Sequence, residues 1–294
     1  MQHFVAVTDD GAPIAERDGD TIVPWWSFTK TIIAAAALVL VRERRLALDD
    51  PLVGRAYTLR QLLQHRAGLT GYDIAEYHAA VANGEQPWAV AELLARTQAE
   101  RLRFPPDQVF AYSNIGYLFV RQLIEETSGE PLGTALSRIV LRPLGIASAR
   151  LAEQPADLRG VAMGPSSYHP GWVYHGLVVG SLLDAAHLLQ RLMTGGLLAP
   201  ELVAQMGDAV PIGHPSIPGR PWNAPAYGLG LMCGRTTDGR RVVGHTGGGP
   251  GSVIAVYHQP EASPSITSAA FAFGDDQGRV EEAAFNGGRD HRSR

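Results

Sequence analysis

A serine and a lysine stand three positions apart near the start of the chain, in the run Trp25-Trp26-Ser27-Phe28-Thr29-Lys30. The apolar, alanine-rich stretch that follows, from Thr31 to Val41, predicts a buried helix that begins near Ser27 and continues to about Arg45. Because residues i and i+3 of a helix share a face, the hydroxyl and the amine should meet. A serine beside a lysine that burial keeps neutral is a nucleophile with its base, so the pair predicts acyl transfer.

Lys30 is the single lysine among the 25 lysines and arginines of the chain. A general replacement of lysine by arginine would explain why lysine is rare. It would not explain why the one that remains stands beside Ser27. The position therefore favours a functional pair.

A second candidate group is Tyr112-Ser113-Asn114. Side chains two positions apart point the same way in an extended segment, so the phenol of Tyr112 and the amide of Asn114 can converge on one site. A tyrosine titrates near pH ~10, but a neighbouring lysine ammonium favours its phenolate, so Tyr112 could carry protons. The alternative is structural, with Tyr112 packed and Asn114 capping the helix that the apolar spacing predicts up to Gly129.

The third group is His245-Thr246-Gly247-Gly248-Gly249, at the end of a strand predicted over Arg241–His245. Glycines let a strand backbone approach a ligand closely and offer an N–H to an oxyanion. The alternative is a glycine-rich turn between this strand and the next one, predicted over Ser252–His258.

In this order and at these separations, the three groups resemble the motifs of the penicilloyl-serine transferase superfamily, which contains the serine β-lactamases and the DD-peptidases. The similarity is closest to the class C β-lactamase-related esterases and peptidases, whose middle motif is Tyr-x-Asn. Leu62-Leu63-Gln64-His65-Arg66-Ala67-Gly68-Leu69 and Tyr227-Gly228-Leu229-Gly230-Leu231 resemble two further stretches of that family. The resemblance implies an α+β fold of the β-lactamase/DD-peptidase type. An antiparallel sheet flanked by helices would carry an inserted all-helical domain, with the site between them.

The resemblance also implies a role for each matching residue. Ser27 would be the acylated nucleophile and Lys30 would take its proton. Tyr112 would relay a proton to the leaving group and activate the deacylating water, and Asn114 would bind the flank of the substrate. The backbone N–H groups of Ser27 and Gly248 would form the oxyanion hole.

The third motif departs from that of the β-lactamases and DD-peptidases, because His245 stands where they carry lysine. A histidine is mostly neutral at about pH 7 and would hold the carboxylate of a β-lactam or a peptide weakly. We therefore expect an ester or amide hydrolase, most simply a carboxylesterase, with His245, Thr246, Gly247 and Gly248 as substrate-binding residues. A β-lactamase or D-amino-acid peptidase using the same residues, and a non-catalytic binding or sensor module, stay open.

Several other residues of chemical interest are expected to be structural. Trp25, Trp26, Trp172, Tyr174 and Trp222 could line an acyl or aryl pocket, but core packing is the commoner use of such side chains. His65, His175 and Asp184 are likewise expected to support the structure.

Composition excludes several classes of protein. A net charge of −4 with 18% charged residues gives no basic surface for nucleic acid or for a membrane. The single cysteine, Cys233, and the scattered histidines supply no metal cluster, so neither a metal nor a cofactor is expected. The N-terminal residues lack a signal-peptide pattern, so a cytoplasmic protein acting on a small-molecule ester or amide is expected. The oligomeric state stays open.

Short apolar runs at both ends of the chain predict strands, whereas the middle is mainly helical. We therefore expect one sheet domain from residues 1–48 and 208–294, and a mainly helical domain from residues 49–207. Residues 287–294 are expected to form a disordered tail.

Overall fold

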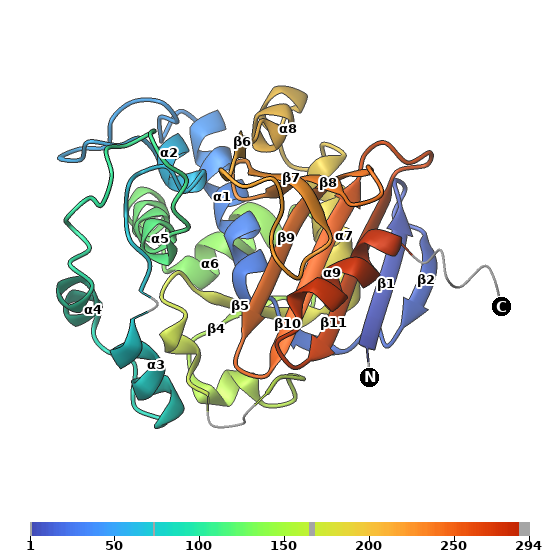
Figure 1. Ribbon diagram of the computed structural model, residues 1–294, viewed down its shortest axis with the longest axis horizontal. Coiled ribbons are helices and arrows are strands. Elements are labelled where there is room, and N and C mark those ends of the chain that lie inside the picture. Colours follow the sequence, from blue (N-terminus) through green and yellow to red (C-terminus); the bar gives the residue numbers. More distant parts are fainter. Residues whose placement is uncertain (1, 73, 165–167, 288–294) are drawn as a thin grey trace.

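The computed structural model describes the 294-residue chain except residues 1, 73, 165–167 and 288–294 (Figure 1). The described residues form an eight-stranded antiparallel sheet. In spatial order its strands are β2 (Pro13–Arg17), β1 (Gln2–Thr8), β11 (Ile266–Phe273), β10 (Ser252–Gln259), β9 (Arg241–Gly249), β8 (Met232–Thr236), β7 (Trp222–Tyr227) and β6 (Val210–Pro211). Because β1 pairs with β11, the two ends of the chain build one sheet, as predicted.

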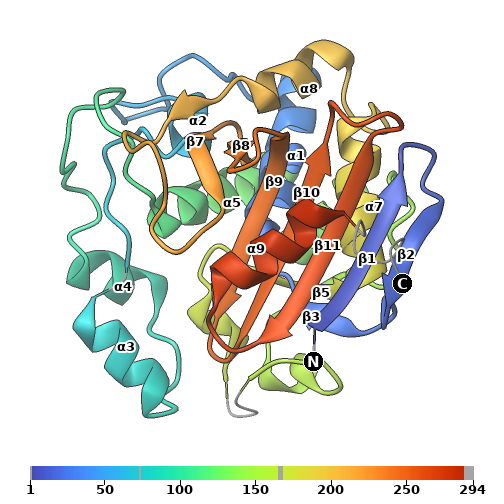
Figure 2. The same cartoon turned by 45° about the vertical axis from the view of Figure 1, so that its right-hand side comes forward.

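Helices cover both faces of this sheet. α7 (Leu182–Met193) contacts β1, β10 and β11, whereas α9 (Gln277–Asn286) contacts β9, β10 and β11 and crosses the front of the sheet in Figure 2. Alternate residues of β10 serve the two faces. Val253, Ala255 and Tyr257 pack with α9, and Ile254 and Val256 belong to the larger core. A strand buried on both faces reads as a continuous apolar run, which explains the unbroken pattern of β10.

The long helix α1 (Thr29–Arg42) runs through the middle of the molecule, and all of its residues from Thr29 to Leu40 are buried. It contacts α5 and α6, while the turn before it contacts β9. A helix that is apolar all round has to be enclosed on every side. The alanine-rich sequence therefore places the start of α1, and with it Ser27, between the sheet and the remaining helices.

Most of the other helices lie on the side of α1 that faces away from the strand β1 (Figure 1). These other helices are α2 (Leu59–Leu63), α3 (Ala75–Ala82), α4 (Val90–Arg96), α5 (Asn114–Ser128), α6 (Leu132–Leu136) and α8 (Pro200–Gly207). A small antiparallel sheet, in the order β3 (Ile22–Pro24), β5 (Leu177–Ser181) and β4 (Arg150–Ala152), joins this part to the segment before α1. None of the helices in the described residues has the length and apolarity that crossing a bilayer requires.

The predicted α+β class, an antiparallel sheet flanked by helices, is confirmed, but two local predictions are wrong. Ser113 and not Asn114 caps α5, because Ser113 Oγ accepts the N–H of Gly116 at 2.9 Å. The strand predicted to end at His245 continues to Gly249 as β9, so the three glycines belong to the strand.

The division into a sheet domain (1–48 and 208–294) and a helical domain (49–207) stays a prediction. α7 falls inside the range predicted as helical, yet it packs on the sheet. Of the predicted tail, Gly287 ends α9 with a φ of +56°. Residues 288–294 lie outside the described residues.

Candidate active site

Ser27 lies in a 3₁₀ turn, Trp26–Phe28, directly before α1. Trp26 has a φ of +36°, in the left-handed region that costs a non-glycine residue on the order of 1–3 kcal/mol. Its indole is held on two sides, because Nε1 donates to Ser252 Oγ at 3.1 Å and the ring meets Tyr168 edge-on at 5.5 Å between centroids. These contacts hold the turn, and the turn presents Ser27 half-buried.

The predicted pair of Ser27 and Lys30 is in contact. Lys30 Nζ donates to Ser27 Oγ at 3.0 Å and lies 3.2 Å from Nε2 of His175, and the Lys30 side chain is fully buried. The amine also lies 5.1 Å from the centroid of the Tyr112 ring. The Ser27 hydroxyl, the Lys30 amine and the Tyr112 ring, which the sequence singled out, therefore lie close together. At this distance an amine with a free lone pair can take the serine proton.

His65, which follows the C-terminal end of α2, positions Tyr112. The two rings lie 4.2 Å apart between centroids, and His65 Nδ1 accepts the backbone N–H of Ser113 at 3.0 Å. Burial lowers the pKa of His65 well below 6.5, so its ring is neutral beside Lys30. The Tyr112 side chain remains exposed, and Asn114 is half-buried at the start of α5. His65 thus supports the segment that carries both predicted residues.

His245 is buried, and both of its ring nitrogens are bonded within the protein. Nδ1 lies 2.7 Å from the carbonyl oxygen of Thr246, which can only accept, so Nδ1 carries the proton. Nε2 then accepts from the Tyr227 hydroxyl at 2.8 Å. Burial, followed by the charge of Lys30, lowers the pKa of His245 to about 3. A neutral ring with no free nitrogen offers no cation to a substrate carboxylate.

The glycines of β9 let the strand lie against the turn that carries Ser27. A Cβ on Gly247 would lie 2.6 Å from the backbone nitrogen of Ser27, and one on Gly249 would lie 2.5 Å from ring carbons of Trp26. A Cβ on Gly248 would lie 3.1 Å from the end of the flexible Gln277 side chain and in ordinary contact, at 3.8 Å, with Val253. The close approach therefore requires glycine at positions 247 and 249, and it leaves Gly248 facing outward and exposed.

A buried carboxylate lies behind β9. Glu281, on α9, accepts from Arg220 Nε at 2.8 Å, from Trp222 Nε1 at 3.0 Å and from the hydroxyl of Thr246. The Arg220 side chain is 17% exposed and the Glu281 side chain is fully buried. The guanidinium and the threonine hydroxyl are therefore both committed to Glu281.

Replacing Glu281 by alanine should lower the free energy of unfolding by about 3–5 kcal/mol, because it leaves the Arg220 charge in a largely buried place without its partner. The exposed pair Arg235–Glu261, whose side chains are 50% and 51% exposed, provides the matched control. Glu261→Ala should cost less than about 1 kcal/mol. Urea denaturation measures both values, and equal losses would contradict this account of Glu281.

Two pockets adjoin Ser27, and both are also lined by Asn114 and Gly248. The Tyr112 pocket, of about 420 Å³, contains Tyr112, His245, Thr246 and Arg220 together with the apolar side chains Phe110, Ile212, Ile217 and Met232. The aromatic pocket, of about 600 Å³, contains Trp26, Tyr72, Tyr77, Tyr168 and His175. A group bound at Ser27 can thus extend in two directions.

Of the five aromatic residues considered as pocket walls, Trp26 lines the aromatic pocket and the other four do not line either pocket beside Ser27. Trp25, Trp172 and Tyr174 lie in the main core, and Trp222 packs under α9. Asp184 accepts the backbone N–H of Ser148 at 2.8 Å and so ties a loop to α7. These positions match the structural uses expected for most of them.

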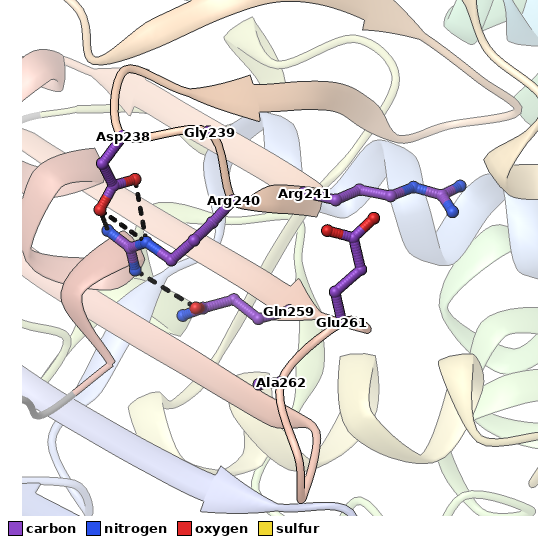
Figure 3. A pocket seen from close by; sticks show the side chains of 7 residues that line it. All are labelled: Asp238, Gly239, Arg240, Arg241, Gln259, Glu261 and Ala262. Carbon is purple, nitrogen blue, oxygen red and sulfur yellow. Dashed lines mark hydrogen bonds and ion pairs between the residues drawn. The ribbon is translucent and has the colours of Figure 1, made fainter.

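Another pocket, of about 320 Å³, lies at the turn between β8 and β9 (Figure 3). Asp238 pairs with Arg240 at 2.7 Å, and Arg240 donates to Gln259 at 3.3 Å. No serine, cysteine or histidine lines this pocket, so we assign no chemistry to it.

Two residues that shape the site were not found as such from the sequence. His175 contacts Lys30 from a position 145 residues away, and Glu281 binds Thr246 and Arg220 from the last described helix. Such long-range pairs leave no spacing signal in one sequence. Trp26, in contrast, stands inside the first motif and was among the aromatic residues considered as pocket walls.

Comparison with known proteins places this geometry in a family. Residues 3–272 match the beta-lactamase family. Putative fimbrial assembly protein FimD, serogroup D, of Dichelobacter nodosus is 30% identical over 135 residues, which cover 41% of this chain and 33% of that protein. Esterase EstB of Burkholderia gladioli is 29% identical over 164 residues, which cover 48% of this chain and 41% of that protein. The matched stretches span less than half of these relatives.

A solved structure shows a similar fold over almost the whole chain. The D-stereospecific amidohydrolase from Streptomyces sp. superposes with a TM-score of 0.79 at 24% identity, covering 97% of this chain and 92% of that one. The fold expected from the three motifs is thereby confirmed. The match over residues 3–272 shows that the chain belongs to the beta-lactamase family.

Proposed function

We propose that this protein is a serine hydrolase that cleaves ester or amide bonds through an acyl-enzyme on Ser27, with carboxylesterase activity as the main one. The observation that carries the proposal is the 3.0 Å contact between Ser27 Oγ and the buried amine of Lys30. Family membership and the similarity to an esterase and an amidohydrolase support it. The substrate would be a small molecule, and the cytoplasmic location expected from the sequence belongs to the same proposal.

In the acylation step, Ser27 Oγ attacks the substrate carbonyl while its proton passes to the lone pair of Lys30 Nζ. The negative charge that develops on the carbonyl oxygen would be met by the backbone N–H groups of Ser27 and Gly248. Tyr112 would then hand a proton to the departing alcohol or amine, and Lys30 would restore the proton of Tyr112. In deacylation, water attacks the same carbonyl and one of its protons passes through Tyr112 to the lone pair of Lys30. The bond between the carbonyl carbon and Ser27 Oγ then breaks, Oγ takes a proton from Lys30, and the acid is released.

The two pockets give the substrate a direction. Tyr112 lines only one of them, and a residue that protonates the leaving group must lie beside it. The leaving group would therefore occupy the Tyr112 pocket, and the acyl group would extend into the aromatic pocket. Asn114, which lines both pockets, would bind the substrate next to the scissile bond, between the acyl group and the leaving group.

The groups of the Tyr112 pocket favour an uncharged leaving group. A β-lactam or a peptide C-terminus brings a carboxylate to this side of the site, where a cation or a free hydroxyl would have to bind it. Here His245 is neutral, Thr246 donates to Glu281, and Arg220 is paired with the same carboxylate. The apolar side chains that line the rest of the pocket suit an alkyl or aryl ester instead.

A comparison of three substrates tests this proposal. A short-chain p-nitrophenyl ester should be hydrolysed with a kcat/KM at least about 100-fold above that of a chromogenic cephalosporin or a D-alanyl peptide, because leaving a charged group unsatisfied costs about 3 kcal/mol or more. Ser27→Ala, which removes the nucleophile, is the blank. Turnover of the cephalosporin or the peptide alone would overturn the esterase assignment and would favour a β-lactamase or a D-amino-acid peptidase.

A further inference from the structure

His175 lies directly against the amine of the proposed base. It is buried, and its Nε2 is 3.2 Å from Lys30 Nζ. Its position is fixed by β5, which begins two residues later and is tied to the start of α1. Trp25 N donates to the carbonyl of Val178 at 2.8 Å, and Val178 N donates to Thr29 Oγ1 at 3.1 Å. The backbone that carries His175 is therefore anchored on both sides of the Ser27 turn.

The hydrogen bonding of His175 differs from that of His245 and His258. His245 uses both ring nitrogens within the protein, and His258 bonds Thr267 Oγ1 in the neighbouring strand. For His175, Lys30 is the bonded partner, whereas Nδ1 is buried with no partner among the described residues. An unpaired polar atom inside a protein carries a cost in free energy. His65, which supports the Tyr112 segment, also has one buried ring nitrogen, Nε2, without a partner among the described residues, so the feature that distinguishes His175 is its contact with Lys30.

The charge state of His175 determines which atom donates. Burial, followed by the charge of Lys30, lowers the pKa of His175 well below 6.5, so the ring is neutral and carries one proton. When Lys30 donates an N–H, Nε2 is the acceptor and the proton of the ring stays on Nδ1.

We propose that His175 is a positioning residue for proton transfer, which accepts an N–H of Lys30 and so holds the amine against Ser27 Oγ. This rests on the proposed function. In acylation the proton of Ser27 Oγ moves to the Lys30 lone pair, and the ammonium that forms keeps its hydrogen bond to Nε2. Lys30 later gives up one proton through Tyr112 to the leaving group. His175 neither gains nor loses a proton in the cycle.

The pH dependence of the reaction reports on this contact. An acceptor stabilises the ammonium form of Lys30, so without it the ammonium gives up its proton at lower pH. The arm of the pH–rate profile on which activity rises with pH would then move to lower pH. The other titratable or charged groups around the contact are Ser27 and Tyr112 at the site, Tyr117 and Arg121 on α5, and the neutral His65 and His245.

Three variants of His175 separate this role from packing. His175→Phe fills the space without an acceptor, and His175→Asn has an amide too short to reach Lys30. In both, the rising arm of kcat/KM for a p-nitrophenyl ester should move down by about one pH unit, with a lower plateau. His175→Gln can place Oε1 near the position of Nε2 and should keep the arm where the wild type has it. His258→Gln, which lines neither pocket, is the control for losing a buried histidine.

The outcomes are distinct. If the rising arm of the pH–rate profile does not move in a folded His175→Phe or His175→Asn variant, the inference is overturned. It is also overturned if the His175→Gln profile shifts as much as the His175→Phe profile. If phenylalanine prevents folding, the asparagine variant decides. A wild type that hydrolyses none of the esters overturns the proposed function, and a wild type active toward them with unshifted variants overturns only the role of His175.

Discussion

Lys30→Arg should reduce the rate at which Ser27 is acylated by about 10²–10⁴, the usual contribution of a general base. Arginine keeps a positive charge near the same place but does not give up its proton, so no lone pair is available for the serine proton. Labelling with a fluorophosphonate, followed by intact-mass spectrometry over time, measures the rate directly. The wild type should gain one adduct, and the mass of a peptide fragment should place it on Ser27.

The fully buried position of Lys30 requires a second variant, because the larger guanidinium could disturb packing. Lys30→Met has a similar length and no charge, and it should lose acylation to the same extent while the circular dichroism spectrum is retained. Ser27→Ala should give no adduct. Labelling of both Lys30 variants at the wild-type rate would show that another group is the base. A folded wild type with no adduct at all would favour a non-catalytic binding or sensor module.

The local part of the site could be predicted from the sequence because helix geometry fixes it. The spacing of Ser27 and Lys30 places both side chains on one face once the apolar stretch is recognised as a helix. The observed 3.0 Å contact follows from that geometry with little help from the rest of the fold. The helix cap in the segment Tyr112-Ser113-Asn114 was harder to predict, because a cap position can shift by one residue without any change in the apolar pattern.

The remaining part of the site depends on contacts between distant segments. His175 reaches Lys30 through the pairing of β5 with β3, and Glu281 reaches Thr246 through the packing of α9 on the sheet. Neither contact has a period or a spacing that a single sequence reveals. The same holds for His245, whose neutrality follows from burial and from the nearby charge of Lys30. The residue type alone predicted that His245 would bind a carboxylate weakly. Its burial, with both ring nitrogens bonded within the protein, is a stronger reason for the same expectation.

The packing of β9 against the turn before α1 also explains how the fold fixes the position of Ser27 relative to this strand. Residues of β9 contact the turn that carries Ser27, and at Gly247 the strand lies against the backbone of Ser27 itself. The sequence showed three successive glycines but could not show which of them needs to lack a side chain. The structure separates them, because Gly247 and Gly249 face the turn while Gly248 faces Gln277.

Gly247→Ala should therefore lower kcat/KM for the p-nitrophenyl ester by about 10²–10³, the cost of losing one oxyanion donor. The added Cβ would lie 2.6 Å from Ser27 N and 2.7 Å from Trp26 Cβ, so either the strand or the turn must move. A shift of about 1 Å between the nucleophile and the oxyanion donors is enough for a loss of this size. Because Lys30 stays beside Ser27, the variant should retain measurable fluorophosphonate labelling.

Glycine-to-alanine variants at two other positions are controls for the loss of activity expected in Gly247→Ala. The only close contact of a Cβ in Gly248→Ala would be the flexible end of Gln277, so this variant should lose much less activity than Gly247→Ala, although the two positions are adjacent in the strand. Gly207→Ala, at the end of α8, has only an arginine nitrogen of Arg241 within 3.8 Å and should leave kcat/KM unchanged. A Gly247→Ala enzyme as active as Gly207→Ala would mean that β9 does not constrain the turn, and the oxyanion hole proposed between Ser27 and Gly248 would have to be abandoned.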